Sequence, residues 1–386
     1  MKNKDLILEI VDNLDINETM YKNAEEKYKN IAKYLESKGL DVEIYPQGSF
    51  RQGTVVRPYR KGKDRNYDLD FICKCFYDKN KYTPVEFKNI IGDILKENEI
   101  YRSRLKEYDR CWTIEYADIQ DNIGFNIDIV PALQANEEFK KELFKYNIES
   151  DIANEFIIIP DSDGKEGSWI SANPEGFALW FESINNQEYI DYRNKIKKEI
   201  FKESRHIFAS IEEIPDYRIK TPLQRTIQIL KRHRDIYYDR SNLNNEKPIS
   251  AIITTLVSYL VAESHETLDL SNLLNMMYEN TRGMEFILKD DNSMLKSVFA
   301  EKIKRSGNNR WELLNPVNPK DNLTDSWTDK TAKEFIKWIS ELEKDLTRGE
   351  SSNNELRSVF GISTDNLDDK YRDIHPIQPW RCNNDG

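Results

Sequence analysis

The sequence predicts an α+β protein with two lobes, a mixed α/β lobe followed by a helical lobe. Five stretches with the composition and apolar alternation of β-strands fall within residues 41–161, and six segments with helical periodicity fall within residues 174–348. A chain of 386 residues is long enough to fold two such lobes. We place the boundary near residues 212–220, which assigns residues 1–212 to a sheet-containing lobe with N-terminal helices and residues 213–386 to a helical lobe with a C-terminal tail.

The first lobe is expected to begin with an amphipathic helix that leads into its first strand. Apolar residues recur at helical spacing between Ala24 and Leu35. Asn17 suits the N-cap of this helix, and Gly39 suits its C-terminal stop. A second helix is predicted over residues 83–98, between the second and third strands. The predicted strands are residues 41–47, 67–76, 111–119, 123–133 and 155–161, and the third and fourth of them form a predicted hairpin.

The second lobe is predicted to be helical. Its third predicted helix has Thr221 as N-cap and Pro222 at the first helical position, where proline is favoured. Residues 315–323 and the last twenty residues are expected to form loops. The predicted helices are residues 174–195, 199–211, 221–238, 249–263, 268–282 and 331–348.

Composition and charge exclude several classes of protein. No apolar run approaches the roughly 20 residues that span a bilayer, and acidic residues interrupt the first 15 residues too early for a signal peptide, so we expect a cytoplasmic protein without membrane contact. The net charge of −11 argues against a broad surface for duplex DNA, because such a surface needs clustered cations. Positive charge gathers in residues 218–234, which suits a small polyanion better than a polymer.

The cysteines and histidines do not predict a structural zinc site. The four cysteines lack the Cys-x2-Cys spacing of zinc ligands, and the four histidines are scattered along the chain. Cys73 and Cys75 flank Lys74 on a predicted strand and therefore point to one face, where we expect buried thiols.

Asp68 and Asp70 are the first candidate catalytic residues. Residues two apart on a strand project from one face, about 6–7 Å apart along the chain, while Leu69 and Phe71 take the other face. Two neighbouring carboxylates repel each other, and a hard divalent ion with oxygen ligands such as Mg²⁺ relieves that repulsion. An Asp-x-Asp pair by itself also fits a solvated strand edge, but the apolar neighbours indicate a central strand.

Asp128 is the third candidate carboxylate. It alternates with Phe125, Ile127 and Ile129 along a predicted strand of buried character. A buried aspartate is unfavourable unless it is paired, hydrogen-bonded or bound to a metal. A hydrogen-bonded or ion-paired core aspartate is therefore the alternative to a metal ligand.

Gly48 and Ser49 lie in a predicted turn from a strand into a helix. Glycine permits close approach of the backbone, and free N–H groups at a helix start favour an anion. A Gly-Ser pair alone is uninformative, but here Asp-x-Asp follows nineteen residues later and a third aspartate lies on a later strand. Together they predict a phosphate-binding turn beside a three-carboxylate site for two metal ions, as in-line nucleotidyl transfer requires.

These motifs resemble those of the bacterial cGAS/DncV-like nucleotidyltransferases (CD-NTases), the signal-generating enzymes of CBASS anti-phage defence. The likeness runs in order from about residue 40 to about residue 330. The Gly-Ser turn and the three aspartates are shared by the whole polymerase-β-like superfamily. Two strings of the predicted helical lobe, PLQRTIQILKRHRD and KPISAIITTL, narrow the resemblance to this branch. The strings that carry the resemblance are QGSFRQGT, YDLDF, NIDIVPA, NPEGFALWF, PLQRTIQILKRHRD and KPISAIITTL.

The resemblance implies a polymerase-β-like nucleotidyltransferase lobe, a helical lobe like that of oligoadenylate synthases, and an active site in the cleft between them. It implies that Asp68, Asp70 and Asp128 bind two Mg²⁺ ions, with Mn²⁺ as a substitute, and that Asp128 helps to activate the attacking ribose hydroxyl. The residues that would hold the donor phosphates are Gln47, Gly48, Ser49, Lys231 and Ser250.

The chemistry of Lys231 and Ser250 suggests roles for them independently of the resemblance. A cation such as Lys231 on a helix facing the cleft can neutralise charge on the β- and γ-phosphates, although a solvated helix face would carry lysine equally well. Ser250 follows Pro248 at a predicted helix start, so an ordinary N-cap is its alternative role. Arg51 and Arg57 follow the Gly-Ser turn, where they could contact phosphate or form ordinary salt bridges.

Base stacking requires aromatic residues in the cleft, and the sequence does not single them out. Most of the candidates are expected to belong to the hydrophobic core. The candidates are Tyr45, Phe50, Tyr67, Trp112, Trp169, Trp180 and Tyr237.

We therefore predict an enzyme that joins nucleoside triphosphates, ATP among them, into a cyclic di- or trinucleotide and releases pyrophosphate. The alternatives are a nucleotidyltransferase that makes linear products or modifies an RNA end, and a nucleotide-binding protein without activity. The chain lacks the His/Cys zinc module of animal cyclic GMP-AMP synthase, so activation by long DNA is not expected. The resemblance also suggests that an accessory ubiquitin-ligase-like protein joins the C-terminal Gly386 to another molecule. The alternative is a frayed terminus without a role.

Overall fold

The computed structural model describes most of the chain. Most of the predicted lobe boundary and the C-terminal tail with Gly386 lie outside the described residues, so the division into two lobes at residue 212 stays a prediction. The described residues are 4–120, 123–136, 140–141, 144–164, 166–203, 219–264, 266–289, 297–306, 309–347 and 353–362.

The first lobe is built on a mixed sheet, which has seven strands in the described part of the chain. The strand order is β1-β4-β7-β6-β5, and β8 pairs with the end of β7 and with β9. The β4–β7 pair is parallel and every other pair in this sheet is antiparallel. The strands are β1 (Val42–Pro46), β4 (Tyr67–Cys75), β5 (Leu105–Glu107), β6 (Trp112–Gln120), β7 (Ile123–Gln134), β8 (Ile157–Asp161) and β9 (Ser168–Ala172).

All five predicted strands and the predicted hairpin of β6 and β7 are confirmed. The sequence did not predict β5 or β9, because segments of three and five residues at the sheet edge carry too little alternation. It also did not predict a separate small hairpin, whose strands are β2 (Tyr59–Arg60) and β3 (Lys63–Asp64).

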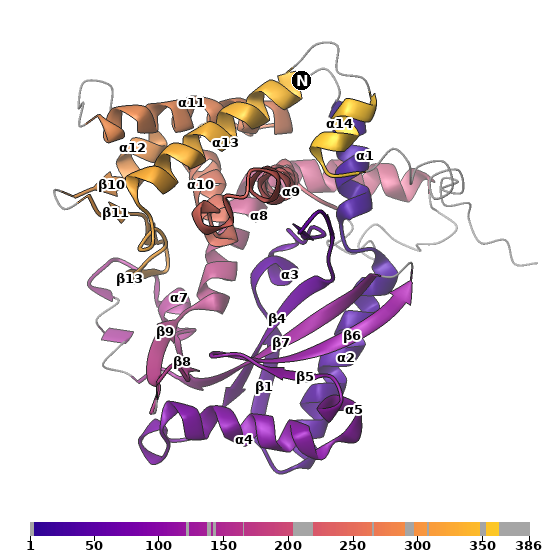
Figure 1. Ribbon diagram of the computed structural model, residues 1–386, viewed down its shortest axis with the longest axis vertical. Helices are drawn as coiled ribbons and strands as arrows, with labels where there is room; N and C mark the ends of the chain where they lie inside the picture. The colour runs from indigo at the N-terminus through magenta and orange to yellow at the C-terminus, as the bar shows by residue number, and fades with distance from the viewer. Residues whose placement is uncertain are drawn as a thin grey trace, which may run out of the picture.

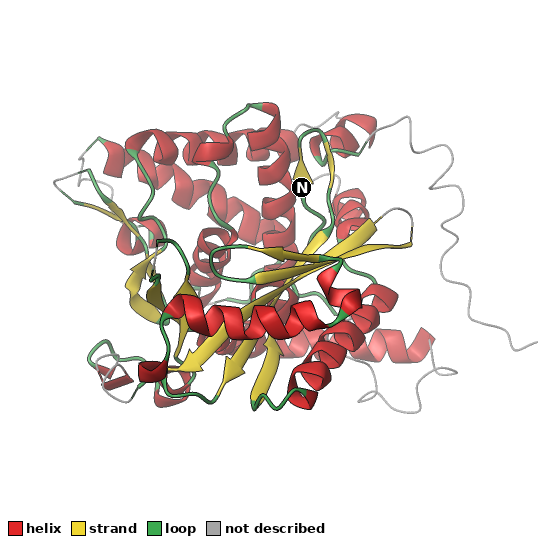
Figure 2. Ribbon diagram, turned by 60° about the horizontal axis from the view of Figure 1, so that its bottom comes forward, coloured by secondary structure: helices red, strands yellow, loops and turns green. Residues whose placement is uncertain are grey.

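Two helices cover one face of the sheet, α2 (Glu18–Ser37) and α4 (Pro84–Glu97). Figure 2 shows α4 lying across the strands. As predicted, the Asn17 side chain caps α2, and Gly39 follows the end of α2 with a φ of +84°. The α2 and α4 helices bury their apolar stripes against alternate residues of the central strands. These alternate residues are Leu69, Phe71 and Cys73 of β4 and Phe125, Ile127 and Ile129 of β7.

The second lobe packs around α9 (Pro222–Arg240), nearly all of whose side chains are buried. Thr221 caps this helix and Pro222 starts it, as predicted. The N-terminal helix α1 (Lys4–Leu14), which the sequence did not predict, buries its apolar face in the core of this lobe rather than against the sheet, and Figure 1 shows it beside α14. Further helices of the second half are α10 (Ser250–Ala262), α11 (Leu270–Leu288), α12 (Val298–Lys302), α13 (Asp329–Thr347) and α14 (Asn353–Val359).

Three expectations for the second half were wrong in detail. Helix α8 (Pro174–Glu203) is one helix with a kink at Tyr189, where two were predicted, and the remainder of the predicted segment 199–211 lies outside the described residues. Helix α11 runs six residues beyond its predicted end. The predicted loop 315–323 contains a hairpin of β12 (Leu314–Asn315) and β13 (Asn318–Asn322), and a second hairpin, β10 (Lys304–Arg305) and β11 (Trp311–Glu312), precedes it.

The β12–β13 hairpin was missed because side-chain hydrogen bonds hold it rather than an apolar alternation. The Asn315 side chain accepts from the Val317 N–H at 3.1 Å, and the Asn322 side chain accepts from the Leu313 N–H at 3.0 Å. Asparagine in such local bonds is also typical of irregular turns, so the sequence pattern favoured a loop.

Two other expectations concern thiols and membranes. Cys73 and Cys75 are buried free thiols, as predicted. Among the described helices, we find none that combines the length and the apolar character of a membrane span.

Candidate active site

The three candidate carboxylates lie together on the face of the sheet that α2 and α4 leave uncovered. In the parallel register of β4 and β7, Asp70 lies opposite Asp128, and Asp68 lies opposite Asn126. Residues 69 and 71 take the other face and are fully buried, so the predicted alternation of both strands is confirmed. Strand pairing therefore brings carboxylates that are about sixty residues apart in sequence into direct proximity.

Hydrogen bonds orient two of the carboxylates. The Thr113 hydroxyl of β6 donates to Asp128 Oδ1 at 2.5 Å, and the Asn126 amide donates to Asp68 Oδ1 at 2.9 Å. Among the described residues, no cation lies within ion-pair distance of Asp68, Asp70 or Asp128. Asp128 is therefore a hydrogen-bonded rather than an ion-paired aspartate, and its role as a metal ligand stays a prediction.

Burial and mutual repulsion raise the pKa values of these carboxyl groups. The pKa of Asp70 is raised to about 7, first by burial and then by the charges of Asp128 and Asp68, and the Lys231 ammonium only partly opposes this rise. Burial also raises the pKa values of Asp68 and Asp128. A cation placed between these groups would stabilise their charged forms.

The donor set suits a divalent cation with oxygen ligands. Carboxylate oxygens come from Asp68, Asp70 and Asp128. Their raised pKa values show that nearby positive charge does not compensate for the burial of these groups. In the described part of the chain, no three Asp, Glu, His or Cys side chains already converge as a complete metal site, so the carboxylates would have to turn toward a shared ion.

The Gly-Ser turn lies directly against Asp70. The Gln47 N–H donates to the Asp70 carbonyl at 2.8 Å, and Gly48 then starts the short helix α3 (Gly48–Gln52) with a φ of +59°. A Cβ atom at position 48 would lie 3.1 Å from Asp70 Oδ2. Glycine is therefore favoured at position 48 by its backbone conformation and by the space beside the carboxylate.

Lys231 reaches the site from the helical lobe. Its Nζ donates to the Thr54 carbonyl at 2.9 Å, just after the Gly-Ser turn. Burial lowers the pKa of Lys231 to about 8, with Arg234 adding to the effect, while Asp235 and Asp70 oppose it. A buried lysine is therefore present beside the turn, and the alternative of a solvated helix face is wrong for this residue.

Ser250 lies at the start of α10 but is not its N-cap. Ile249 occupies the N-cap position without a side-chain cap, which excludes the ordinary N-cap role considered for Ser250. The Ser250 hydroxyl accepts from Arg234 Nη1 at 3.1 Å, and Asp235 holds the same guanidinium at 2.8 Å. The Ser250 side chain is therefore oriented by α9.

Internal ion pairs neutralise most of the described cations of the basic segment 218–234. Lys231 lines the candidate site, and its ammonium donates to a backbone carbonyl rather than to a carboxylate. The ion pairs are Lys220–Asp15, Arg225–Asp12, Arg225–Asp15, Arg232–Asp64 and Arg234–Asp235.

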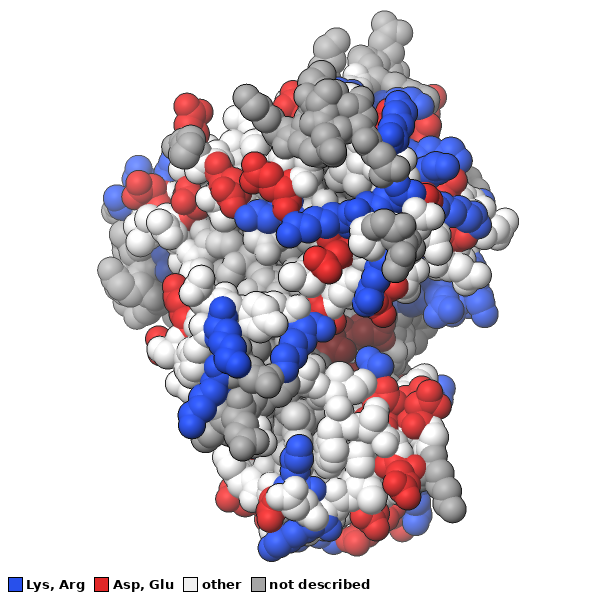
Figure 3. Space-filling model, turned by 90° about the vertical axis from the view of Figure 1, so that its left-hand side faces the viewer, with Lys and Arg blue, Asp and Glu red and all other residues white. Residues whose placement is uncertain are grey.

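Two cavities meet at this site, between the sheet and the helical lobe. Their volumes are about 550 Å³ and about 1240 Å³. Figure 3 shows the hollow between the lobes, with acidic side chains deep inside and lysines and arginines nearby. Gln47 and Asp128 line only the smaller cavity and Asp68 only the larger one, so all eight predicted site residues line one or both. The residues that line both cavities are Gly48, Ser49, Asp70, Lys231 and Ser250.

The two cavities differ in chemistry. Apolar side chains such as Ile72, Val130 and Phe177 form part of the lining of the smaller cavity. Basic residues surround the larger cavity, which suits phosphate groups. These basic residues are Arg60, Lys61, Lys63, Arg65, Lys106, Lys231, Arg234 and Lys247.

Other residues considered for the site lie elsewhere. Arg51 forms ion pairs with Glu175 and Glu182, and Arg57 lies 3.4 Å from Asp64, so the salt-bridge alternative is confirmed for both arginines. Within the described residues, none of the seven aromatic candidates lines either cavity, and most belong to the core as expected. The aromatic residues that do line the cavities are Tyr59, Tyr108 and Phe177.

The sequence carried no local signal for these three aromatic residues. Tyr59 begins the unpredicted hairpin β2–β3, Tyr108 follows the unpredicted strand β5, and Phe177 lies in the first turn of α8. Their exposure to the cavities depends on how distant elements pack.

Comparisons with known proteins identify relatives over nearly the whole chain. A family model described as the Second Messenger Oligonucleotide or Dinucleotide Synthetase domain (SMODS) matches residues 1–185. A Roseivirga ehrenbergii protein named c-di-GMP synthase is 28% identical over 371 residues, which are 93% of this chain and 84% of that protein. The cyclic dinucleotide synthase CdnG of Bradyrhizobium diazoefficiens is 24% identical over 247 residues, which are 60% of this chain and 53% of that protein.

Solved structures show the same fold. The structure of B. diazoefficiens CdnG in complex with GTP superimposes with a TM-score of 0.65 and 18% identity, over 92% of this chain and 94% of that chain. The structure of E. coli MS115-1 CdnC with ATP gives a TM-score of 0.57 and 12% identity, over 92% of this chain and 97% of that chain. The predicted α+β architecture, a mixed sheet joined to a helical lobe, is confirmed.

Proposed function

This chain belongs to the bacterial cGAS/DncV-like nucleotidyltransferases (CD-NTases), and we propose that it joins two nucleoside triphosphates into a cyclic dinucleotide with a role in CBASS anti-phage defence. It is an enzyme with a polymerase-β-like nucleotidyltransferase lobe, of the cyclic oligonucleotide synthase type. The name of the R. ehrenbergii relative, c-di-GMP synthase, favours GTP as a substrate of this chain as well.

The observation that carries the proposal is the shared wall between the two cavities. Joining two nucleotides requires two binding sites that meet at the reacting atoms. The smaller cavity has the usual size of a small-ligand site, and the larger one is lined by more lysines and arginines. Asp70, the Gly-Ser turn and Lys231 line both cavities, which supports a reaction at their junction.

In the proposed reaction, a ribose hydroxyl of one nucleotide attacks the α-phosphorus of the other. A new P–O bond forms as the hydroxyl loses its proton to solvent, the bond between the α-phosphorus and the oxygen that bridges to the β-phosphate breaks, and pyrophosphate leaves. Asp68, Asp70 and Asp128 would hold two Mg²⁺ ions, or Mn²⁺ in their place, which neutralise phosphate charge and favour ionisation of the hydroxyl. Asp128, fixed by the Thr113 hydroxyl, would orient the attacking hydroxyl. A second transfer in the opposite direction would close the ring.

The helical lobe would stabilise the leaving group. Lys231 would place a buried positive charge beside the β- and γ-phosphates, where removal from water makes it more effective. Gly48 and Ser49 would bind the same phosphates from the sheet side, with Gln47 beside them, and Ser250 would contact them from the start of α10. The hydrogen bond from Arg234 would orient the Ser250 hydroxyl for this contact.

The proposal is tested by incubating the purified chain with ATP, GTP, CTP and UTP, together and in pairs, with Mg²⁺ or Mn²⁺. Products are treated with phosphatase and identified by mass spectrometry. We expect phosphatase-resistant species with the mass of a cyclic dinucleotide, which the double variant Asp68→Asn/Asp70→Asn does not make. Linear species alone would contradict ring closure, and no product from any mixture would contradict the proposed activity.

One further part of the functional prediction concerns the C-terminal tail. A conjugating accessory protein would act on Gly386, which lies outside the described residues. We propose that it does so when the neighbouring genes are co-expressed. An unmodified C-terminal carboxylate in mass spectra of that co-expressed protein would contradict this part.

A further inference from the structure

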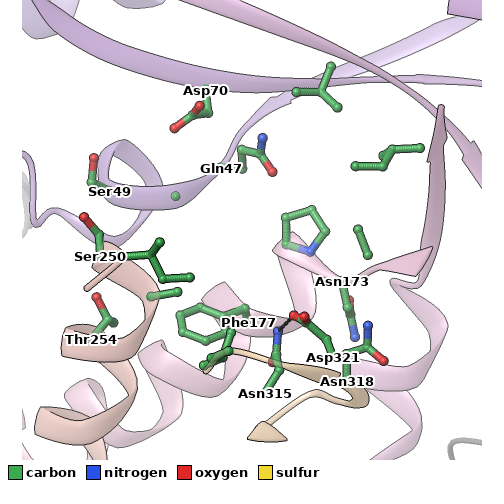
Figure 4. Close-up of a pocket in the computed structure, with 18 of the residues that line it drawn as sticks. Gln47, Ser49, Asp70, Asn173, Phe177, Ser250, Thr254, Asn315, Asn318 and Asp321 are labelled. Carbon is green, nitrogen blue, oxygen red and sulfur yellow. Dashed lines mark hydrogen bonds between the residues drawn. The ribbon is translucent and has the colours of Figure 1, made fainter. Parts of the chain in front are cut away.

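The smaller cavity ends in a polar wall far from the catalytic carboxylates. Figure 4 shows Ser49, Asp70 and Ser250 at one end, Phe177 in between, and a group of amide and carboxyl side chains at the other end. Most of this wall comes from the β12–β13 hairpin of the helical lobe. Its polar residues are Asn173, Asn315, Asn318, Asp321 and Asn322.

Three of the four asparagines in this wall make a hydrogen bond to the protein through both the nitrogen and the oxygen of the side-chain amide. Asn173 donates to the Ile152 carbonyl and accepts from the Gly176 N–H. Asn322 donates to the Trp311 carbonyl and accepts from the Leu313 N–H. Asn315 donates to Asp321 and accepts from Val317. These amides build the wall and have defined orientations.

Asn318 differs from the other three. Its side-chain amide donates to the Ser171 carbonyl at 3.5 Å, which turns Oδ1 away from that carbonyl. Asn318 Oδ1 is buried without a hydrogen-bond partner in the described structure, although the residue is only 1% exposed and lines the cavity. A buried acceptor without a partner destabilises the fold unless a ligand or water donates to it.

Asp321 supplies a second acceptor on the same wall. The Asn315 amide holds Asp321 Oδ2 at 3.0 Å, which fixes the carboxylate while leaving further lone pairs of both oxygens available. Figure 4 shows Asp321 and Asn318 on the same side of the cavity. The wall therefore offers oxygen acceptors from two side chains, and the amide donors around them are anchored in the protein.

We propose that this wall selects guanine, so that Asn318 and Asp321 determine the base of one of the two nucleotides; this inference rests on the proposed nucleotidyltransferase function. Guanine presents two adjacent kinds of donor, N1–H and the N2 amino group, to a pair of acceptors. Adenine and cytosine present a ring-nitrogen acceptor beside their amino group, and that lone pair is repelled by a carboxylate. Uracil presents a single donor between two carbonyl oxygens. A site built from acceptors therefore rejects the other three bases.

The rest of the cavity suits a nucleotide in this orientation. Between the polar wall and the Gly-Ser turn, the lining is apolar and includes Phe177, Ile72 and Val130, which can contact the faces of a purine ring. The phosphate-binding residues lie at the opposite end of the same cavity. A single nucleotide would thus place its base at Asn318 and Asp321 and its phosphates near Ser49.

The first experiment compares GTP, ATP and inosine triphosphate, which lacks only the N2 amino group, as substrates of the wild-type enzyme. We expect kcat/KM for inosine triphosphate to fall at least tenfold below that for GTP, because one buried acceptor loses its donor. Asn318→Leu should remove most of this difference between the two substrates. Equal use of GTP and inosine triphosphate would contradict a contact to the N2 group.

The second experiment uses Asp321→Asn, a change without loss of volume at an exposed position. The new amide can pair with adenine, so the ratio of GTP to ATP use should fall at least tenfold. The matched control is Asp325→Asn, which removes the same charge from a nearby exposed residue that does not line the cavity. An unchanged GTP/ATP ratio in Asp321→Asn would overturn the proposal.

Calorimetric titration of the whole chain with GTP and with ATP, with Ca²⁺ in place of Mg²⁺, separates this inference from the proposed function. If no product forms but GTP binds at least tenfold more tightly than ATP, and Asp321→Asn removes the difference, the base-selecting wall stands while the proposed activity fails. If products form without guanine, the activity stands and the wall does not select guanine. Equal binding of both nucleotides without product would contradict both.

Discussion

The two faces of the central strands β4 and β7 have opposite roles although they come from the same residues of sequence. One face carries Leu69, Phe71 and Ile127, which pack under α2 and α4. The other carries Asp70 and Asp128, which repel each other beside the cavities. A two-residue alternation can thus divide stability and chemistry between the faces of a sheet, and the face that carries the aspartates lowers stability until a cation or substrate binds.

The largest effect should come from the chemical face. Asp70→Asn should lower kcat by at least about 10³-fold with little change in far-ultraviolet circular dichroism, because the amide cannot supply the carboxylate charge. Production of cyclic dinucleotide by mass spectrometry measures the loss. Asp93→Asn, on the solvent side of α4, is the matched control and should keep full activity. Activity of Asp70→Asn within tenfold of wild type would remove Asp70 from the mechanism.

The neighbouring residue on the packed face should show the reverse pattern. Leu69→Ala should lower the free energy of unfolding by about 2–5 kcal/mol, because it leaves a cavity under α2 and α4. Urea unfolding followed by fluorescence measures this change. The folded fraction should keep a kcat close to that of wild type. A large loss of kcat without loss of stability would contradict the assignment of Leu69 to stability rather than to catalysis.

The helical lobe should contribute a smaller effect on rate than the carboxylates. Lys231→Met should lower kcat/KM by about 10²-fold, because the charge beside the phosphates is lost. Since the pKa of Lys231 is lowered to about 8, its positive charge is lost as pH rises through that value, and kcat/KM of the wild type should fall above about pH 8. Lys231→Arg keeps its charge and should move this alkaline limb upward. If kcat/KM falls at the same alkaline pH in Lys231→Arg and in the wild type, then a group other than Lys231 causes the fall.

The smallest effect concerns stability without metal. The pKa of Asp70 is about 7 in the folded chain and near its ordinary 3.8 when unfolded, so between these values the folded state binds the extra proton. Stability from this group is therefore present below about pH 4 and is lost as pH rises through about 7. In EDTA, Asp70→Asn should gain on the order of 2 °C in Tm over wild type at pH 8 and less at pH 5. A gain that does not grow with pH would show that Asp70 is not repelled as inferred.

The fold was largely predictable where the signal is local. The five strands longer than four residues that carry apolar alternation, the caps at Asn17 and Thr221, and the proline at the start of α9 follow from neighbouring residues. The carboxylate site was predictable for the same reason, because alternation shows which face each aspartate takes. Strands β5 and β9, the kink in α8 and the β12–β13 hairpin lack such local patterns.

The sequence alone predicts the candidate catalytic end of the site, namely the Gly-Ser turn and the three aspartates on alternating strand positions. Tertiary structure alone decided the placement of α1 in the helical lobe and the neutralisation of the basic segment by Asp12, Asp15 and Asp64. It also decided that Asn318 keeps an acceptor without a partner at the far end of a cavity. This difference arises because the face that a strand residue takes depends on neighbours two residues away, whereas burial, ion pairing and unmet hydrogen bonds depend on residues far along the chain.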